Sequence, residues 1–294
     1  MWLQAASDEL CLVSHTTIKN HARSLCIKGP RDDPSGAIAQ LRSHALAFCF
    51  EIECRFDLTI ELAQSTANID TEFEDEEFDS YDFSDSFLPR NRYDQNVLGL
   101  YLEGRQAVST TAQFLAYYQV LEYFYADAIQ REAIDKVENL LKDAQLPYGS
   151  RRQARALVLA AQATGGSVPE RDQLKALLRR LVSSADLLQF IDSRDASLRR
   201  ALTAKEPRAK GVEPIKLSPD NGNLLADFAN RIYAIRNRIV HAKSSDEFKE
   251  APPLWPGTPE VQLIAADVAV VRFLARRTLS LNSEPLYTNA PSNL

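Results

Sequence analysis

The sequence has few histidines and no long hydrophobic run, and both shortages exclude classes of protein. A transmembrane helix needs about 18 or more consecutive apolar residues, and no such run occurs among the 294 residues. The first residues, MWLQAASDEL, lack both the basic and the apolar region of a signal peptide. We therefore expect a soluble, cytoplasmic protein with no membrane partner.

Only four histidines are present, and a single one, His241, follows residue 44. This excludes a histidine-rich metal centre in the C-terminal part of the chain. The phosphate-binding glycine motifs G-x-x-x-x-G-K-[S/T] and G-x-G-x-x-G are missing, as is the metalloprotease motif H-E-x-x-H. The sequence therefore predicts no cofactor and no bound metal.

The four cysteines all lie in the first fifth of the chain, and no two of them have C-x-x-C spacing. Structural zinc sites usually show tightly paired ligands. We therefore interpret these residues as reduced, half-buried cysteines, with a zinc site as the less favoured alternative; they are Cys11, Cys26, Cys49 and Cys54.

Charge is distributed unevenly between two parts of the chain. Residues 1–91 contain 17 acidic and 7 basic residues, a net charge of -10, whereas residues 92–294 contain 23 acidic and 27 basic residues, a net charge of +4. Such asymmetry predicts two regions with different functions.

The segment 48–62, FCFEIECRFDLTIEL, alternates between apolar and polar residues. A period of two over this length is typical of a half-buried strand. The stretches ELCLVSH and SLCIKG, nearer the N-terminus, could pair with that strand. We therefore predict an α+β fold in which residues 1–68 form a small antiparallel β region.

An acidic segment follows the predicted β region. Residues 69–87, IDTEFEDEEFDSYDFSDSF, contain nine acidic residues and no basic one, with aromatic residues at intervals. We interpret residues 69–91 as a solvated linker. The alternative is that the acidic segment occupies a basic groove or binds a partner.

From about residue 92 the apolar residues recur with a helical period. Residues 92–294 are therefore predicted to form an all-helical bundle. The expected helices cover the segment TAQFLAYYQVLEYFYADAI and residues 130–145, 151–164, 170–182, 184–203, 223–242 and 259–281.

The predicted helix at 223–242 carries the segment Arg236-Asn237-Arg238-Ile239-Val240-His241. Phe228, Ile232, Ile235 and Ile239 form its apolar stripe, and Asn237 and His241 are i,i+4 neighbours on the other side. Arg236 and His241 are five residues apart, which corresponds to about 140° on an ideal helix. Either the helix distorts near His241 or a second copy of the chain supplies the missing partner.

This segment resembles the R-x(4–6)-H signature of the HEPN superfamily, named for higher eukaryotes and prokaryotes nucleotide-binding. The resemblance in motif covers six residues, and that in architecture roughly residues 92–281. It implies a metal-independent endoribonuclease of a prokaryotic defence or toxin system, acting on RNA. It also implies a homodimer with a composite site, and an antitoxin or sensor subunit as a further partner.

The residue types suit this chemistry. A neutral histidine, with a pKa near about 6.5, can take the 2′-OH proton of RNA, and an arginine can stabilise the charge that develops on the phosphate. We therefore assign His241 as the base or acid, Arg236 as the phosphate ligand and Asn237 as the orienting residue. Arg238 and Lys243 are predicted to add attraction for the RNA backbone.

Two alternatives remain open at this point. A non-catalytic HEPN-like module could serve as a scaffold or dimerisation unit, or the chain could bind a nucleotide without cleaving it. Glu122, a polar residue within an otherwise apolar helix, could hold Arg236 or could pair with another base.

Overall fold

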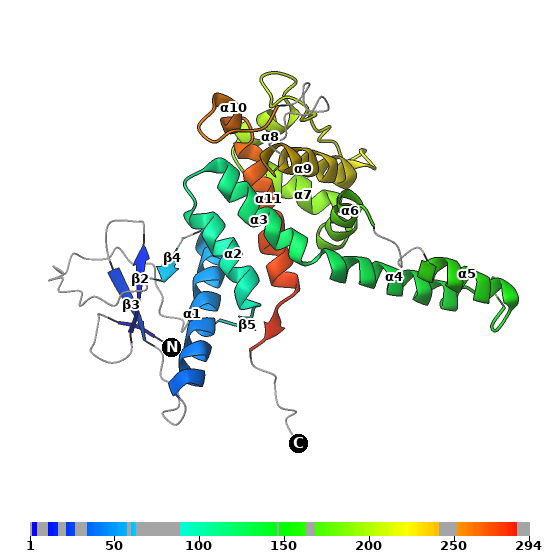
Figure 1. The fold of residues 1–294 in the computed structure, drawn as a ribbon, viewed down its shortest axis with the longest axis horizontal. Coiled ribbons are helices and arrows are strands. Elements are labelled where there is room, and N and C mark those ends of the chain that lie inside the picture. The colour runs from blue at the N-terminus through cyan, green and yellow to red at the C-terminus, as the bar shows by residue number, and fades with distance from the viewer. Residues whose placement is uncertain are drawn as a thin grey trace. The chain divides into compact units, whose positions relative to one another are not determined.

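The structure is a computed structural model, and it shows a mostly helical chain (Figure 1). The chain forms two compact units. The N-terminal unit consists of residues 1–102 and 282–294, and the helical unit consists of residues 103–281. The structure describes residues 2–4, 11–16, 22–26, 34–57, 60–62, 89–145, 147–162, 168–240 and 252–286.

The N-terminal unit contains short strands and one long helix. Helix α1 spans Pro34–Phe56, and α2 begins in this unit and spans Gln95–Gln106. The strands pair antiparallel in the orders β1-β3-β2-β4 and β5-β6. They are β1 (Trp2–Gln4), β2 (Cys11–Thr16), β3 (Ala22–Cys26), β4 (Ile60–Leu62), β5 (Asn91–Arg92) and β6 (Glu284–Pro285). Because α1 occupies the middle of residues 1–68, a separate β domain over that range stays a prediction.

The predicted strand at 48–62 is wrong. Residues 48–56 belong to α1, and only Ile60–Leu62 form a strand. The alternation misleads because both kinds of residue are buried: Phe50 and Ile52 are 0% exposed, while Glu51 and Glu53 are 6% and 1% exposed. A helix buried on most of its circumference loses the helical period in its apolar residues, so a chance alternation suggests a strand.

Both buried carboxylates of α1 accept hydrogen bonds through their Oε1 atoms, although Oε2 of Glu53 has no hydrogen-bond partner among the described residues. The Oε1 atom of Glu51 accepts hydrogen bonds from the backbone N–H groups of Arg90 and Asn91, at 2.9 and 3.1 Å. The Tyr101 hydroxyl donates to Oε1 of Glu53 at 2.6 Å. Cys49 is also buried, and this burial raises the pKa of its thiol to about 12, so that it stays protonated.

The helical unit is a helical bundle, as predicted, but some boundaries differ. The predicted helices at 184–203 and 259–281 are each divided in two, and the first two predicted helices divide at Phe124. Helix α3 packs along α11, and α9 packs on α6 and α3. Figure 1 shows α4 extending away from these helices, with α5 packed against its far end. The helices are α3 (Thr110–Tyr123), α4 (Tyr125–Lys142), α5 (Arg151–Gln162), α6 (Glu170–Leu181), α7 (Ser184–Asp192), α8 (Ala196–Thr203), α9 (Leu224–Val240), α10 (Pro259–Gln262) and α11 (Ala265–Leu281).

The core of the helical unit consists of apolar and aromatic side chains from these helices. On α3, the fully buried side chains Phe114, Tyr117 and Tyr118 face the interior, as the helical period predicts. In the part of the chain that the structure describes, no helix is long and apolar enough to cross a membrane.

Candidate functional site

Helix α9 places the predicted motif against the bundle by burying its apolar stripe. Phe228, Ile232 and Ile235 are at most 1% exposed, which confirms the predicted orientation of the helix, and Ile239 is half-buried. The last residue of α9 is Val240. His241 and Lys243 lie outside the described residues, so their roles as base and RNA-backbone ligand stay predictions.

Arg236 lies in a cluster of polar and aromatic side chains contributed by three helices. Its Nη2 atom is 3.2 Å from Oε1 of Glu170, the first residue of α6, and 4.0 Å from Oε1 of Glu122 on α3. The guanidinium also lies over the ring of Tyr118, 5.7 Å from its centroid. These contacts fix the position of the charge while leaving the Arg236 side chain 17% exposed.

Tyr118 and Glu170 hold each other within this cluster. The Tyr118 hydroxyl donates a 2.6 Å hydrogen bond to the same Oε1 atom of Glu170 that pairs with Arg236. Burial raises the pKa of Tyr118 above its ordinary value, and Tyr125 and Glu170 raise it further. The Tyr118 phenol therefore stays protonated and donates its hydrogen bond. Oε1 of Glu170 thus contacts both the neutral Tyr118 hydroxyl and the charged Arg236 guanidinium.

Asn237 and Glu122 both contact Arg236. The side-chain oxygen of Asn237 accepts a 3.2 Å hydrogen bond from Nη1 of Arg236. Asn237 therefore contacts Arg236. Its role in orienting the His241 imidazole stays a prediction, because His241 lies outside the described residues. Glu122 approaches Arg236 only to 4.0 Å with a side chain that is 45% exposed, so Glu170 is the closer carboxylate.

Arg238 is buried, in contrast to its predicted role as an exposed RNA ligand. Its side chain is 3% exposed, and its Nε atom donates to the Pro252 carbonyl oxygen at 2.7 Å. Its Nη1 atom donates to the Lys210 carbonyl oxygen at 2.7 Å and pairs with Oε1 of Glu260 at 2.9 Å. This guanidinium joins three segments of the helical unit, and it is not at the surface where an RNA phosphate would bind.

The surroundings of Glu260 lower the pKa of its carboxyl group, which pairs with the buried Arg238. Burial acts to raise the pKa of its carboxyl group, but hydrogen bonds from Arg238 and the Lys210 backbone N–H, together with the arginine charge, hold the pKa below its ordinary value. The carboxylate therefore stays ionised at neutral pH and stabilises the arginine.

A third arginine of α9, Arg231, forms an ion pair that the sequence analysis did not find. Its Nε and Nη2 atoms donate to the two carboxylate oxygens of Asp267 on α11, at 2.6 and 2.9 Å. Its Nη1 atom donates to the Glu213 carbonyl oxygen at 2.6 Å. Both side chains are almost completely buried, so the bidentate pair joins α9 to α11 in the interior.

The Arg236 cluster can bind and orient an anion, but the carboxylates next to Arg236 compete with that anion. A phosphate that reaches Arg236 must share the guanidinium with Glu170, which repels it. Within the described ranges, no three His, Cys, Asp or Glu side chains gather in a way that could hold a metal ion. The cluster therefore combines the positive charge of Arg236 with the carboxylates of Glu170 and Glu122.

The protein is thus a helical bundle with one partly exposed, ion-paired arginine, Arg236, near the end of α9. The family model described as "Methylamine utilization protein MauJ" matches residues 97–280. Because this match covers more than half of the chain, the chain belongs to the MauJ family. No curated protein and no solved structure matches the chain.

Proposed function

We propose that this protein is a metal-independent endoribonuclease of the HEPN type, with a role in a prokaryotic defence or toxin system. The observation that supports the proposal is the placement of Arg236, a partly exposed guanidinium oriented by Glu170 and Tyr118, five residues before His241 in the sequence. An arginine in this state can hold a phosphate because it is charged, positioned and within reach of solvent.

The proposed reaction is an intramolecular transesterification of RNA. His241 removes the proton of a 2′-OH group, and the resulting 2′-oxygen attacks the adjacent phosphorus. Arg236 stabilises the negative charge on the non-bridging oxygens as the bond to the 5′-oxygen breaks. The leaving 5′-oxygen takes up a proton from an acid, so the products are a 2′,3′-cyclic phosphate and a free 5′-OH.

A homodimer is part of the proposal, because Arg236 and His241 point about 140° apart on an ideal helix. A second copy of the chain would supply His241 opposite Arg236 and complete one composite site. RNA is the proposed substrate. An antitoxin or sensor subunit is a further partner implied by the HEPN resemblance.

The test is cleavage of a mixed RNA pool by the purified full chain in excess EDTA. Wild type is expected to cut and to leave cyclic phosphate ends, whereas Arg236→Ala and His241→Ala are each expected to lose about 100-fold or more in rate. Arg131→Ala is the matched control, because Arg131 is an exposed arginine that pairs with Asp127 on its own helix. Its rate is expected to equal that of wild type.

Three results would contradict the proposal. Loss of cutting in EDTA that added metal restores would show a metal-dependent mechanism, and unchanged cutting by Arg236→Ala would remove the arginine from the site. A variant lacking residues 69–87 belongs in the same assay, because nine acidic residues could compete with RNA for a basic site. Lack of cutting by this variant as well would exclude the nuclease.

A second candidate is a non-catalytic helical module that acts in methylamine utilization. The description of the MauJ family names that process, and the ion pairs of Arg236 with Glu170 and Glu122 also suit a structural arginine. Under this alternative neither the wild type nor the variant lacking residues 69–87 cleaves RNA. Arg236→Ala then lowers the free energy of unfolding without changing any activity.

A further inference from the structure

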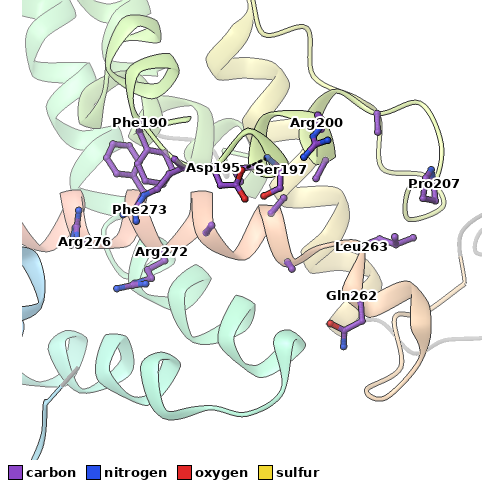
Figure 2. A pocket seen from close by; sticks show the side chains of 17 residues that line it. Phe190, Asp195, Ser197, Arg200, Pro207, Gln262, Leu263, Arg272, Phe273 and Arg276 are labelled. Atoms are coloured by element: carbon purple, nitrogen blue, oxygen red, sulfur yellow. Dashed lines mark hydrogen bonds between the residues drawn. The ribbon is translucent and has the colours of Figure 1, made fainter. Parts of the chain in front are cut away.

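A groove in the helical unit lies apart from the Arg236 cluster. It has a volume of about 760 Å³ and is lined by residues of α7, α8 and α11 and of the segments beside α8 and α10. Figure 2 shows the stacked rings of Phe190 and Phe273 at one end and Pro207 and Leu263 toward the other. The volume falls in the range of small-molecule sites, which are mostly apolar with a few polar groups.

The floor of the groove consists of small apolar side chains. Ala265, Ala266 and Ala269 line it from α11, and Ala201 and Ala204 line it from α8 and the residue that follows. Larger side chains at these positions would fill the space between the helices, as they do in a packed core. The alanines therefore leave room for an apolar group that the described residues do not supply.

The rim carries positive charge. Four arginines line the groove, and the one acidic residue among the lining side chains is Asp195. The carboxylate of Asp195 caps α8 by accepting a hydrogen bond from the backbone N–H of Ser197, seen as a dashed line in Figure 2. The arginines are Arg194, Arg200, Arg272 and Arg276.

Three of these arginines gather at the aromatic end. Arg272 and Arg276 flank Phe273 on α11 and lie one turn apart, a spacing at which like charges repel each other. Arg194 lies over the ring of Phe190, 5.4 Å from its centroid, and Phe190 stacks on Phe273 with the centroids 4.1 Å apart. An anion bound beside these guanidinium groups would be attracted by their charges.

We propose that this groove binds a small amphiphilic anion. The apolar chain or ring of the ligand lies on the alanine floor, and its carboxylate or phosphate head binds Arg272 and Arg276. An apolar floor favours such a ligand over RNA, whose bases need polar partners for their edges and whose backbone carries a charge at every nucleotide. The proposal is independent of the ribonuclease activity proposed above.

Isothermal titration of the full chain with decanoate and with decyl phosphate, both below their micellar concentrations, tests the proposal. One of the two is expected to bind with a stoichiometry of one, and the tighter ligand identifies the head group. Arg272→Gln combined with Arg276→Gln is expected to weaken binding by about tenfold or more, because two charge-assisted contacts are lost. Ala269→Leu, which fills the floor, is expected to weaken it by a similar factor.

The matched control is the pair Arg151→Gln and Arg152→Gln, which removes two exposed arginines from α5 and is expected to leave the affinity within about twofold. Decyltrimethylammonium, with the same chain and the opposite charge, is expected not to bind. Equal binding of this cation, unchanged affinity in both groove variants, or displacement of the ligand by a single-stranded RNA would each overturn the proposal.

Discussion

Two faces of helix α9 present arginines in opposite circumstances. Arg231 and Arg238 lie seven residues apart, about two turns, and therefore share a face that is directed into the protein. Their carboxylate partners, Asp267 and Glu260, are 1% and 29% exposed. Arg236 lies on another face, and its nearest carboxylate, Glu170, is 24% exposed.

The comparison teaches that the surroundings of an arginine, rather than the motif around it, decide what it can do. Arg231 and Arg238 also donate to backbone carbonyl oxygens, so neither can leave its place without stranding buried polar groups. Arg236 pairs with the side chains of Glu170, Glu122 and Asn237, and side chains can rearrange when a ligand binds. This difference between the two buried arginines and Arg236 predicts the order in which substitutions lower the free energy of unfolding.

The largest effect is expected for Asp267→Ala. This change leaves the Arg231 guanidinium buried without its bidentate partner, so the free energy of unfolding should fall by about 3–5 kcal/mol. Urea denaturation measures the loss. Glu138→Ala, which breaks a fully exposed ion pair with Lys142, is the control and should leave the midpoint unchanged.

Arg238→Ala is expected to follow, with a loss of about 2–3 kcal/mol, because two carbonyl oxygens and one carboxylate lose a charged donor. Arg131→Ala provides the comparison, since Arg131 is 53% exposed and its ion pair should contribute less than about 1 kcal/mol. Equal losses in the two variants would contradict the structural role of Arg238.

The contribution of Glu260 is expected to depend on pH. Its pKa in the folded protein is lower than its ordinary value of 4.5, so its stabilising effect is fully present above that value. The effect is lost as the pH falls through the folded pKa. Denaturation of wild type and Glu260→Gln between pH 3 and pH 7 should therefore show a stability difference that is constant at the upper end and shrinks below about pH 4.5.

The smallest effect on stability is expected for Glu170→Gln. Glutamine keeps a carbonyl oxygen for the Tyr118 hydroxyl and removes a charge that is partly exposed, so the change should be less than about 1 kcal/mol. The same variant should bind RNA more tightly, because the carboxylate no longer competes for Arg236. Fluorescence anisotropy of a labelled RNA in EDTA measures this, and weaker binding would contradict it.

Much of the fold was predictable from the sequence. Most helices between residues 110 and 281 follow from apolar residues with a helical period, and the Pro-rich turn before Thr258 marks the start of the last predicted helix. The breaks within 184–203 and 259–281 were not predicted. Helix α1 was not predictable in this way, because Glu51 and Glu53 are buried by hydrogen bonds to residues about 40 positions away. Local periodicity carries no information about such partners.

The candidate site was predictable only in part. The motif drew attention to Arg236, and the suggestion that Glu122 approaches it is met at 4.0 Å. Glu170 has no signal in the sequence, since an acidic residue at the start of a helix is ordinary and its contact with Arg236 spans 66 positions. The seven-residue spacing of Arg231 and Arg238 predicts that they share a face of α9, but it does not indicate that this face is buried.

The central claim is that Arg236 is the one arginine of this helix's motif that serves function rather than folding. The most direct test is the value of kcat/KM for a defined single-stranded RNA in EDTA, measured for wild type and Arg236→Ala on preparations whose free energy of unfolding is also known. The account predicts a loss of about 100-fold or more in kcat/KM with less than about 1 kcal/mol lost in stability. A wild type without activity, or a loss of activity matched by unfolding of the variant, would contradict it.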